Sequence, residues 1–382
     1  MTIKRKNIFF KFLIVCITYL FIEIICFATI QLGYIPAKKA NFHFVAKNPK
    51  YPLPMADINE TWGTWHYKEN FRSQNGCIYF DYAINSYGAR DKERKQNSTD
   101  SNRVIVLGDS FLEGWGIDEN KRLSTLLEKE TGHEFLNFSC ADFGTTQEYL
   151  VYKYLAASFS HSTIFIGFLP FNDFENDDKA YWEKQKRYRP FFVKSDSAYQ
   201  LIYDKPSIKE SELNKEFYKS QSNSFKETLA RFLRSFTYWF NIVDYIKNAR
   251  NQKKFFSFKN NKVVSYYYDY TPEQIEKFKF VLSKIREAAP AKRIILCSIP
   301  VIPDILRRKE DGKPPLPDEL NNISKSMNIE YVDLLPYFAE KTDYRNYFFF
   351  CDTHWNENAN TYVSKILLPL FNKQATEGTK EY

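Results

Sequence analysis

Ser110 stands in "RVIVLGDSFLEGWGI" (Arg103–Ile117), where a short apolar run gives way to a polar turn. The run Val104–Leu107 has the length and β-branching of a buried strand, and the residues after Ser110 suit the start of a helix. A serine at the carboxyl end of a strand in a parallel sheet lies where such sheets hold ligands. Ser110 is therefore a candidate oxygen nucleophile, although a Gly-Asp-Ser turn by itself is more often an ordinary structural turn.

A serine nucleophile needs a base, and the chain has five histidines: His43, His66, His133, His161 and His354. The first two lie in an N-terminal lead-in, and the next two precede predicted strands, at the wrong edge of a sheet. His354 instead follows the last predicted strand, in "FFFCDTHWNENAN", with Asp352 two residues earlier. Positions i and i+2 of an extended segment point to the same side. Asp352 can therefore orient the imidazole while the other ring nitrogen faces a serine.

Donors for an oxyanion are expected in the loops after the neighbouring strands. The second predicted strand runs into "NFSCADFGTTQEY", where Asp142 or Gly144 could present a backbone N–H. The third runs into "GFLPFNDFEN", where Asn172 offers a side-chain amide. Each is an ordinary turn residue when taken alone. Together with Ser110 and the Asp352–His354 pair, they predict an acyl-transfer site at one edge of one sheet.

The elements that would position these residues alternate along the chain. Predicted strands are Val104–Leu107, Glu134–Phe138, Thr163–Leu169, Arg293–Pro300 and Ile329–Leu335. Predicted helices are Glu119–Thr131, Thr145–Ser158, Thr271–Ala289, Pro317–Met327 and Asn356–Phe371, the third with a capping box at Thr271 and Gln274. Alternating strands and helices predict a doubly wound α/β fold with a parallel sheet and helices on both faces.

Three parts are expected: an N-terminal tip and anchor at 1–30, a lead-in at 31–100, and the α/β domain at 101–382, which contains an insert at 174–270. Within the insert, Phe225–Asn248 carries apolar residues at helical spacing. A helix that faces the core or acts as a lid is the preferred interpretation. The alternative is a cationic, aromatic face that lies against a bilayer.

The N-terminal segment Phe12–Ile30 has 19 residues and a single charge, Glu23. That length is about enough to cross a ~30 Å hydrocarbon layer. Basic residues precede it, so the N-terminus should be cytoplasmic and the body extracytoplasmic, periplasmic or extracellular. Because no small-x-small cleavage site is evident, we expect a single-pass anchor in the cell membrane; the alternative is a cleaved signal.

Composition excludes some classes of function. The formal charge is +8 over 382 residues and the cations are interspersed with acids, which argues against a nucleic-acid partner. No cluster has the spacing of metal ligands, so neither a metal nor a cofactor is expected. Outside the anchor lie Cys77, Cys140, Cys297 and Cys351. Buried free thiols are the simpler interpretation, and a bridge between Cys140 and Cys351 remains open.

The motif blocks resemble the SGNH/GDSL hydrolase superfamily. They are "VLGDSF" at Ser110, "NFSCADFGT", "FNDF" at Asn172, and "DTHWN"; "INSYGARD" and "RYRPFFV" resemble features of membrane-anchored bacterial members. The resemblance implies a three-layer α/β/α, flavodoxin-like fold and ester chemistry without a cofactor. Ser110 would be the nucleophile, His354 the base and Asp352 its orienting partner. The oxyanion hole would combine the Ser110 N–H, an N–H of the Asp142–Gly144 loop, and Asn172.

Two departures from the family pattern bear on function. Asp142 falls where the family places its oxyanion glycine, and Asp352 and His354 have the Asp-x-His spacing of alginate-type O-acetyltransferases, although in those the pair precedes the serine block. The sequence therefore predicts a serine esterase or deacylase that acts on ester-linked acyl groups of an extracytoplasmic glycan or lipid. The alternatives are an O-acyltransferase that modifies an envelope polysaccharide and a non-catalytic carbohydrate-binding component.

Overall fold

The computed structural model describes residues 3–35, 57–66, 71–75, 78–183, 188–196, 198–204, 225–251, 256, 258–259, 262–350 and 352–372. Its centre is a parallel five-stranded sheet in the order β13-β12-β7-β5-β6. The strands are β5 (Val104–Leu107), β6 (Phe135–Asn137), β7 (Thr163–Phe168), β12 (Arg293–Ser298) and β13 (Glu330–Asp333). In chain order this is the 2-1-3-4-5 arrangement of flavodoxin-like folds. The predicted fold class is confirmed.

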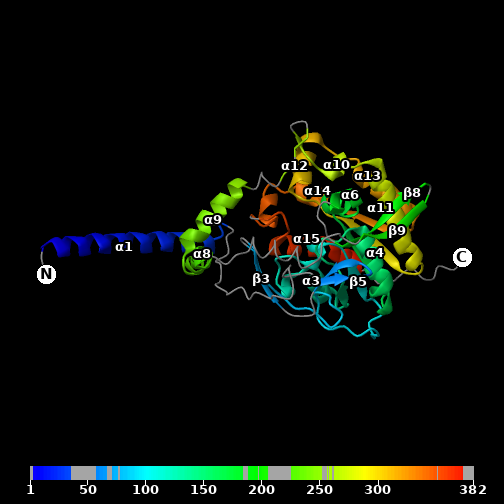
Figure 1. Cartoon of the computed structure of the whole chain (residues 1–382), viewed down its shortest axis with the longest axis horizontal. Helices are drawn as coiled ribbons and strands as arrows, with labels where there is room; N and C mark the ends of the chain where they lie inside the picture. Colours follow the sequence, from blue (N-terminus) through cyan, green and yellow to red (C-terminus); the bar gives the residue numbers. More distant parts are fainter. Residues whose placement is uncertain are drawn as a thin grey trace.

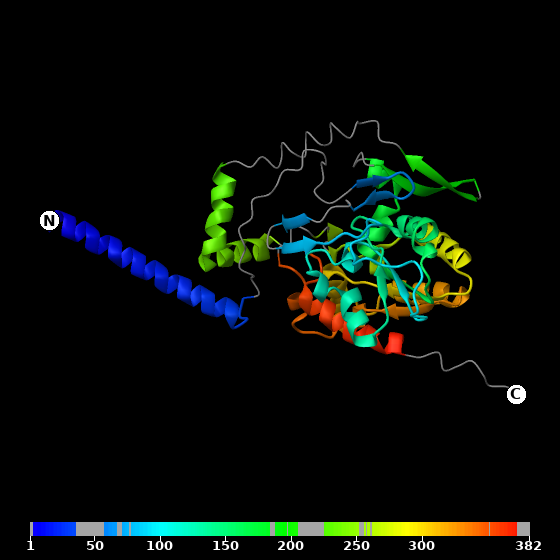
Figure 2. The ribbon, with the colours of Figure 1, turned by 90° about the horizontal axis from the view of Figure 1, so that it is seen from below.

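Helices cover both faces of the sheet (Figures 1 and 2). On one face α3 (Leu123–Thr131) packs against α15 (Glu357–Asn372), and on the other α4 (Thr145–Tyr154) packs against α11 (Pro272–Ala288). The side chains of β5, β6 and β7 are all buried, which is why these strands are apolar on both faces. The predicted capping box is present: Gln274 N–H donates to Thr271 Oγ1 at 3.3 Å, and Thr271 N–H to Gln274 Oε1 at 2.8 Å.

Shorter elements complete the body. The remaining helices of the body are α2 (Ser110–Glu113), α5 (Pro170–Asn176), α6 (Lys179–Glu183), α10 (Tyr266–Asp269), α12 (Ile302–Asp311), α13 (Leu316–Ser326) and α14 (Leu335–Ala339). The 3₁₀ turns are η1 (Glu119–Lys121), η2 (Ala156–Ser158) and η4 (Tyr344–Tyr347). The described residues also form four antiparallel hairpins outside the central sheet: β1 (Asp57–Asn59) with β2 (Gly63–Trp65), β3 (Phe71–Asn75) with β4 (Ile78–Tyr82), β8 (Arg189–Ser195) with β9 (Ala198–Asp204), and β10 (Phe258–Lys259) with β11 (Lys262–Val263).

The helical segment of the insert forms two helices, α8 (Phe225–Phe236) and α9 (Tyr238–Asn251). The expectation that its apolar residues face the core is wrong, because Phe236 is 64% exposed and Trp239 43% exposed. Both helices lie beside α1 (Ile3–Gln31), away from the sheet (Figures 1 and 2). The core therefore does not explain their apolar side chains.

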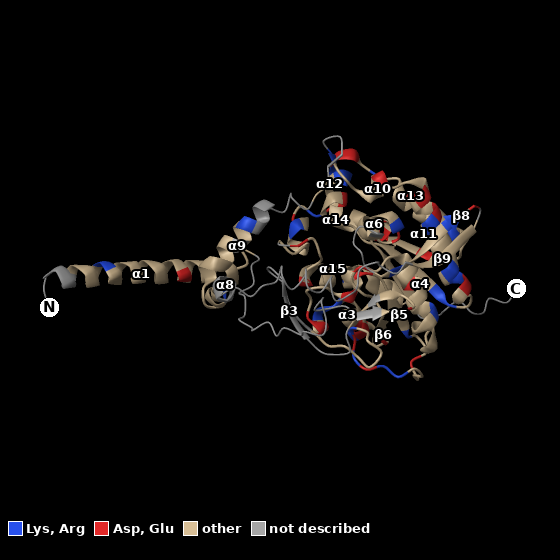
Figure 3. Cartoon of the chain, in the orientation of Figure 1, with Lys and Arg blue, Asp and Glu red and all other residues tan. Residues whose placement is uncertain are grey.

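The helix α1 is long and apolar enough to cross a membrane over Asn7–Gln31, a stretch of 25 residues with mean hydropathy 2.5. It projects from the body, and its apolar side chains are exposed along most of its length. Figure 3 shows almost no charge on it, in contrast to the mixed charges of the body.

Gly167, the fifth of the six residues of β7, allows α2 to approach the sheet closely. A Cβ at this position would lie 2.4 Å from Leu112 Cδ1, 2.7 Å from Leu112 Cγ and 3.0 Å from Ile299 Cδ1. Leu112 belongs to α2 and is buried, so its side chain cannot move away freely. We therefore expect Gly167→Ala to lower the free energy of unfolding by about 1–3 kcal/mol, measured by urea denaturation of the detergent-solubilised chain.

The matched test of this clash is a double variant. In Gly167→Ala/Leu112→Ala the overlap is removed. The double variant should therefore lose less free energy of unfolding than the two single variants lose in sum. Strictly additive losses would show that Leu112 does not restrict residue 167.

Candidate active site

Ser110 is the first residue of α2 and follows β5 after only Gly108 and Asp109. The turn is fixed by Asp109, which caps α2: its Oδ1 accepts the Phe111 N–H at 2.9 Å. The strand β5 lies between β6 and β7, where the strand order reverses. Ser110 therefore lies at the topological switch point, the usual ligand position of such sheets.

The structure brings together three side chains singled out in the sequence. Ser110 Oγ lies 2.8 Å from His354 Nε2. His354 Nδ1 lies 2.5 Å from Asp352 Oδ1, and the same oxygen accepts the His354 backbone N–H at 3.0 Å. Because a carboxylate only accepts, Nδ1 carries the proton and Nε2 is left to accept from the serine hydroxyl.

The route by which Asp352 reaches His354 differs from the prediction. Residues 352–354 form bends and not an extended segment. The carboxylate turns back onto the backbone N–H two residues on, as aspartate does in tight turns. On either side, Phe348 and Trp355 form an antiparallel bridge and Phe349 N–H donates to His354 O at 2.9 Å. The predicted extended geometry is therefore wrong, although the two side chains do meet.

Aromatic rings hold the imidazole from the serine side. The centroid of the Phe111 ring lies 5.0 Å from that of His354, and the Trp115 ring lies 5.9 Å from it. Phe111 also packs edge-on against the buried Trp355. The loop that carries His354 is thus packed onto the helix that carries Ser110.

Electrostatics favour the charged forms of the His354–Asp352 pair. Burial alone would lower the pKa of His354, but the adjacent Asp352 carboxylate, with smaller contributions from Asp109 and Glu113, raises it above its usual value. Burial alone would raise the pKa of Asp352, and His354 together with two backbone N–H groups lowers it instead. The site therefore stabilises an imidazolium next to a carboxylate.

Asn172 lies in the first turn of α5, directly after β7, as its position in the sequence suggested. Its Nδ2 donates to Asp109 Oδ2 at 3.0 Å. This bond fixes which way the amide faces, because an amide oxygen in the same place would meet a carboxylate. Burial raises the pKa of Asp109 to about 6, although the Phe111 N–H and the Asn172 amide both act to lower it.

The two loop residues considered as oxyanion donors are in different environments. The Gly144 N–H donates to Gln147 Oε1 at 3.1 Å, and Arg189 Nη2 donates to the same oxygen at 2.8 Å. Gly144 therefore uses its N–H at the start of α4. Asp142 adopts a left-handed backbone with φ of 65°. Its loop runs along the end of β5, where Cys140 N–H donates to Gly108 O at 3.1 Å.

Sequence reasoning missed a buried pair behind Ser110, His66 and Glu113. His66 Nδ1 lies 3.0 Å from Gly88 O and its Nε2 lies 3.1 Å from Glu113 Oε1, so both ring nitrogens face acceptors. The imidazole therefore links the backbone carbonyl of Gly88 to the carboxyl group of Glu113. Glu113 Oε2 accepts the Ala141 N–H at 2.6 Å, which ties α2 to the loop that holds Asp142. Nothing in the local pattern around His66 could have shown this contact across 47 residues.

Arg90, within the quoted "INSYGARD", was also missed as a site-forming residue. Its buried guanidinium donates to the carbonyl oxygens of Glu113 (3.2 Å), Gly114 and Ile117 (2.6 Å). These carbonyls follow the end of α2, where Gly114 adopts a left-handed φ of 82° that favours glycine. Arg90 thereby fixes the helix that begins with Ser110.

Two cysteines of the body lie in described parts of the chain. Cys140 and Cys297 are free and buried, and burial raises the pKa of both thiols well above the usual value. Cys77 and Cys351 lie outside the described residues, and because Cys140 is free, the structure does not form the bridge between Cys140 and Cys351 that the sequence left open. Among the residues that the structure describes, no three His, Cys, Asp or Glu side chains are grouped to hold a metal ion.

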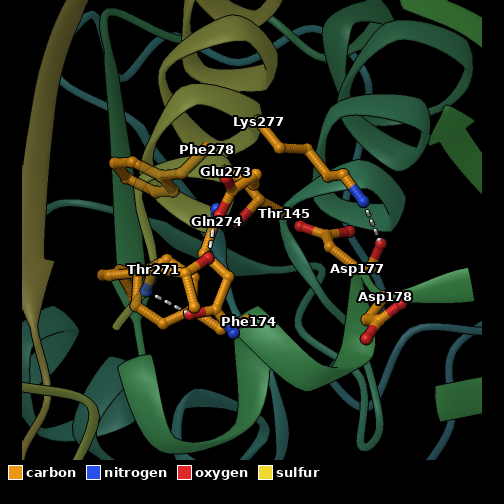
Figure 4. A pocket seen from close by; sticks show the side chains of 10 residues that line it. Thr145, Phe174, Asp177, Asp178, Thr271, Glu273, Gln274, Lys277 and Phe278 are labelled. Atoms are coloured by element: carbon orange, nitrogen blue, oxygen red, sulfur yellow. Dashed lines mark hydrogen bonds between the residues drawn. The ribbon is translucent and has the colours of Figure 1, made fainter. Parts of the chain in front are cut away.

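A separate cavity of about 250 Å³ opens between α4, α5 and α11 (Figure 4). In Figure 4, Lys277 reaches across it and donates to the Asp177 carbonyl oxygen at 2.9 Å. Thr145, Phe174 and Phe278 line other sides. None of the six residues singled out in the sequence lines this cavity, so it is not the site described above.

No protein-family model matches the chain, and no curated protein matches it. Solved structures do. A lipase/acylhydrolase from Enterococcus faecalis is 11% identical and covers 72% of this chain and 100% of its own, with a TM-score of 0.36. A member of the lipolytic protein G-D-S-L family from Veillonella parvula is 11% identical and covers 71% and 99%, with a TM-score of 0.37.

A carbohydrate esterase family 2 enzyme with a carbohydrate-binding domain, from Corynascus thermopiles, is also 11% identical. It covers 71% of this chain and 65% of its own, with a TM-score of 0.37. At this identity the similarities assign no substrate and no catalytic residue.

The contact between Asp352 and His354 makes a direct prediction. In Asp352→Asn the carboxylate that raises the pKa of His354 is lost while burial remains, so that pKa should fall. Titration of the imidazole by NMR would measure it. The matched control is Asp343→Asn, an exposed aspartate in the same loop region, which should leave the His354 pKa unchanged. Equal pKa values in the Asp352→Asn variant and the unmodified chain would contradict this account.

Proposed function

We propose that this protein is a serine esterase of the SGNH type, which removes ester-linked acyl groups. The observation that carries the proposal is the hydrogen-bonded chain from Ser110 Oγ through His354 to Asp352, with 2.8 Å and 2.5 Å between the paired atoms. A serine hydroxyl is a weak nucleophile at its ordinary pKa, and an adjacent oriented imidazole is the usual means of activating it.

In the proposed reaction, Ser110 Oγ attacks the ester carbonyl carbon while His354 Nε2 takes the hydroxyl proton. Asp352 holds Nδ1 and stabilises the imidazolium that forms. The tetrahedral intermediate collapses as the alkoxide leaves with the proton from His354, and the acyl group stays on Ser110. Water, deprotonated by His354, then attacks this ester and releases the carboxylic acid, which restores Ser110.

The negative charge on the former carbonyl oxygen would be held by three donors: the N–H of Ser110, the N–H of Asp142, and Asn172 Nδ2. Two observations support this set. The Gly144 N–H already donates to Gln147 Oε1, which argues against Gly144 as a donor to the oxyanion. Asp109 takes one N–H of the Asn172 amide, which leaves the second N–H on the same nitrogen to bind the oxyanion.

We further propose that α1 is an uncleaved anchor with its N-terminus in the cytoplasm and the body on the outer side of the membrane. The basic residues before the apolar stretch support this orientation. The substrate would then be an acylated glycan or lipid of the cell envelope. Hydrolysis and O-acyl transfer would use the same residues and differ in whether water or a sugar hydroxyl reaches the acyl-enzyme.

The decisive test is intact-protein mass spectrometry of the full chain in detergent after brief exposure to p-nitrophenyl acetate. We expect a mass increase of one acetyl group that is absent in Ser110→Ala. Fast loss of the adduct supports an esterase, whereas a persistent adduct that an acceptor glycan removes supports a transferase. If the unmodified chain acquires no adduct from this or from longer acyl esters, the protein is a binding component and the proposal fails.

A second prediction concerns the oxyanion donors. Asn172→Ala should reduce turnover of p-nitrophenyl acetate by about two to three orders of magnitude, because one such donor contributes ~3 kcal/mol to the barrier. Its midpoint of thermal unfolding should stay near that of the unmodified chain. The exposed Asn102 provides the matched control, since Asn102→Ala should keep full activity. Undiminished turnover in Asn172→Ala would remove this amide from the oxyanion hole.

A further inference from the structure

The helices α8 and α9 expose an apolar surface that the body does not cover. Seven of its side chains are 38–64% exposed: Leu229, Leu233, Phe236, Trp239, Phe240, Val243 and Ile246. We name these residues the hairpin face. Contiguous apolar patches are uncommon on surfaces in contact with water and indicate a partner or a lipid phase.

The corner between the two helices is attached to α1 by a polar contact. Glu23 Oε2 accepts the Tyr238 N–H at 2.6 Å, and Glu23 Oε1 accepts the Trp239 N–H at 3.2 Å. Tyr19, one turn earlier on α1, lies beside Glu23 and Thr237. One turn later, the ring of Phe27 lies edge-on to that of Tyr238 with centroids 5.1 Å apart. The corner is thus fixed to three successive turns of α1.

The position of Glu23 along α1 gives the depth of this contact. The apolar stretch of α1 ends at Gln31, eight residues after Glu23. At ~1.5 Å per residue, Glu23 lies about 12 Å along the helix from that end. In a bilayer with a ~30 Å hydrocarbon core, that point is inside the leaflet nearer the body. If α1 spans the membrane, the corner of α8 and α9 must therefore be inside the membrane as well.

The contact satisfies polar groups that hydrocarbon would leave without partners. A carboxylate at this depth is costly unless it is paired. The first N–H groups of a helix have no partner within the helix, and they carry its positive dipole end. Glu23 supplies acceptor oxygens to the first N–H groups of α9, and those N–H groups supply hydrogen-bond donors to the carboxylate. This explains the one charged residue within the apolar stretch Phe12–Ile30.

The end of α8 is satisfied in the same way, without water. Thr237 Oγ1 donates to Leu233 O at 2.9 Å, and Asn241 Nδ2 donates to Arg234 O at 2.9 Å and to Thr237 O at 2.5 Å. Asn241 is itself buried. Side chains thus donate hydrogen bonds to backbone carbonyl groups that water usually satisfies at the end of a helix. A membrane requires this of any backbone that leaves helical geometry within it.

We propose that α8 and α9 form a re-entrant hairpin in the leaflet nearer the body, with the hairpin face against lipid acyl chains and Glu23 as its anchor point. The occupant of the face is lipid because the face is continuous with α1, whose own apolar side chains are exposed. This proposal depends on α1 spanning the membrane and not on the chemistry at Ser110.

Trp239 provides a direct test in the full chain reconstituted into phosphatidylcholine nanodiscs. Lipid brominated in the middle of its acyl chains quenches tryptophan emission on contact, and we expect it to reduce the emission of the unmodified chain. Trp239→Phe should abolish that reduction, whereas the matched control Trp115→Phe, which alters a half-buried residue of the body, should retain it. If quenching is absent, or if it persists in Trp239→Phe, the hairpin face does not meet lipid and another protein surface covers it.

Glu23 is tested in the same nanodiscs. In Glu23→Ala, Tyr238 N–H and Trp239 N–H lose their acceptor, so α9 should move towards the headgroups. Quenching of Trp239 should then shift from mid-chain bromine towards bromine placed near the headgroups. Glu23→Gln keeps an acceptor oxygen and should show a smaller shift, and Glu310→Ala on the exposed end of α12 should show none. An unchanged depth profile in Glu23→Ala would show that Glu23 does not hold α9 at its depth. The comparison with Trp239→Phe would still test whether the hairpin face contacts lipid.

Discussion

A hydrogen bond between side chains 244 residues apart, from Ser110 to His354, sets the demands that the rest of the structure meets. Neither residue lies within a strand, so the sheet alone cannot fix the distance between them. The serine needs a rigid turn after β5, and the histidine needs a rigid loop before α15. Asp109 and Arg90 hold the turn and helix that carry Ser110 from the two ends. The bridge of Phe348 with Trp355 and the ring of Phe111 hold the loop that carries His354.

Several buried acidic side chains lie close to one another around the turn that carries Ser110. Their surroundings shift their pKa values in different directions. Burial raises the pKa of Asp109 to about 6. Burial, and then the neighbouring carboxylates, raise the pKa values of Glu148 and Asp173 well above normal. Glu113 is the opposite case: His66 and Arg90 outweigh burial and lower its pKa. Negative charge near His354 thus comes first from Asp352, which contacts it, with smaller contributions from Asp109 and from Glu113, which is paired with His66.

The sequence predicted the sheet well because the parallel strands are buried on both faces, and short apolar runs such as Val104–Leu107 and Thr163–Leu169 report that directly. It also predicted that Ser110 and the Asp352–His354 pair lie together, since strand ends determine an edge of the sheet. It could not predict polar contacts between residues far apart in the sequence, such as the one between His66 and Glu113, because no local pattern marks them. It also failed for α8 and α9, because helical spacing shows that one face is apolar but not whether protein or lipid covers it.

Two points on α9, its first turn and its middle, connect the proposed membrane contact to the proposed active site. Its first turn is held by Glu23 of α1, and further along, the ring of Tyr245 lies edge-on to that of Phe350, with centroids 4.6 Å apart. Phe350 is two residues before Asp352 in the chain. Seven residues of helix separate Tyr238 from Tyr245, a rise of about 10 Å. A helix is stiff over that length, so a fixed depth for the start of α9 also fixes the height of the His354 loop above the membrane. An esterase held in this way would reach ester groups at one distance from the lipid surface, which is the geometry that a membrane-attached substrate requires.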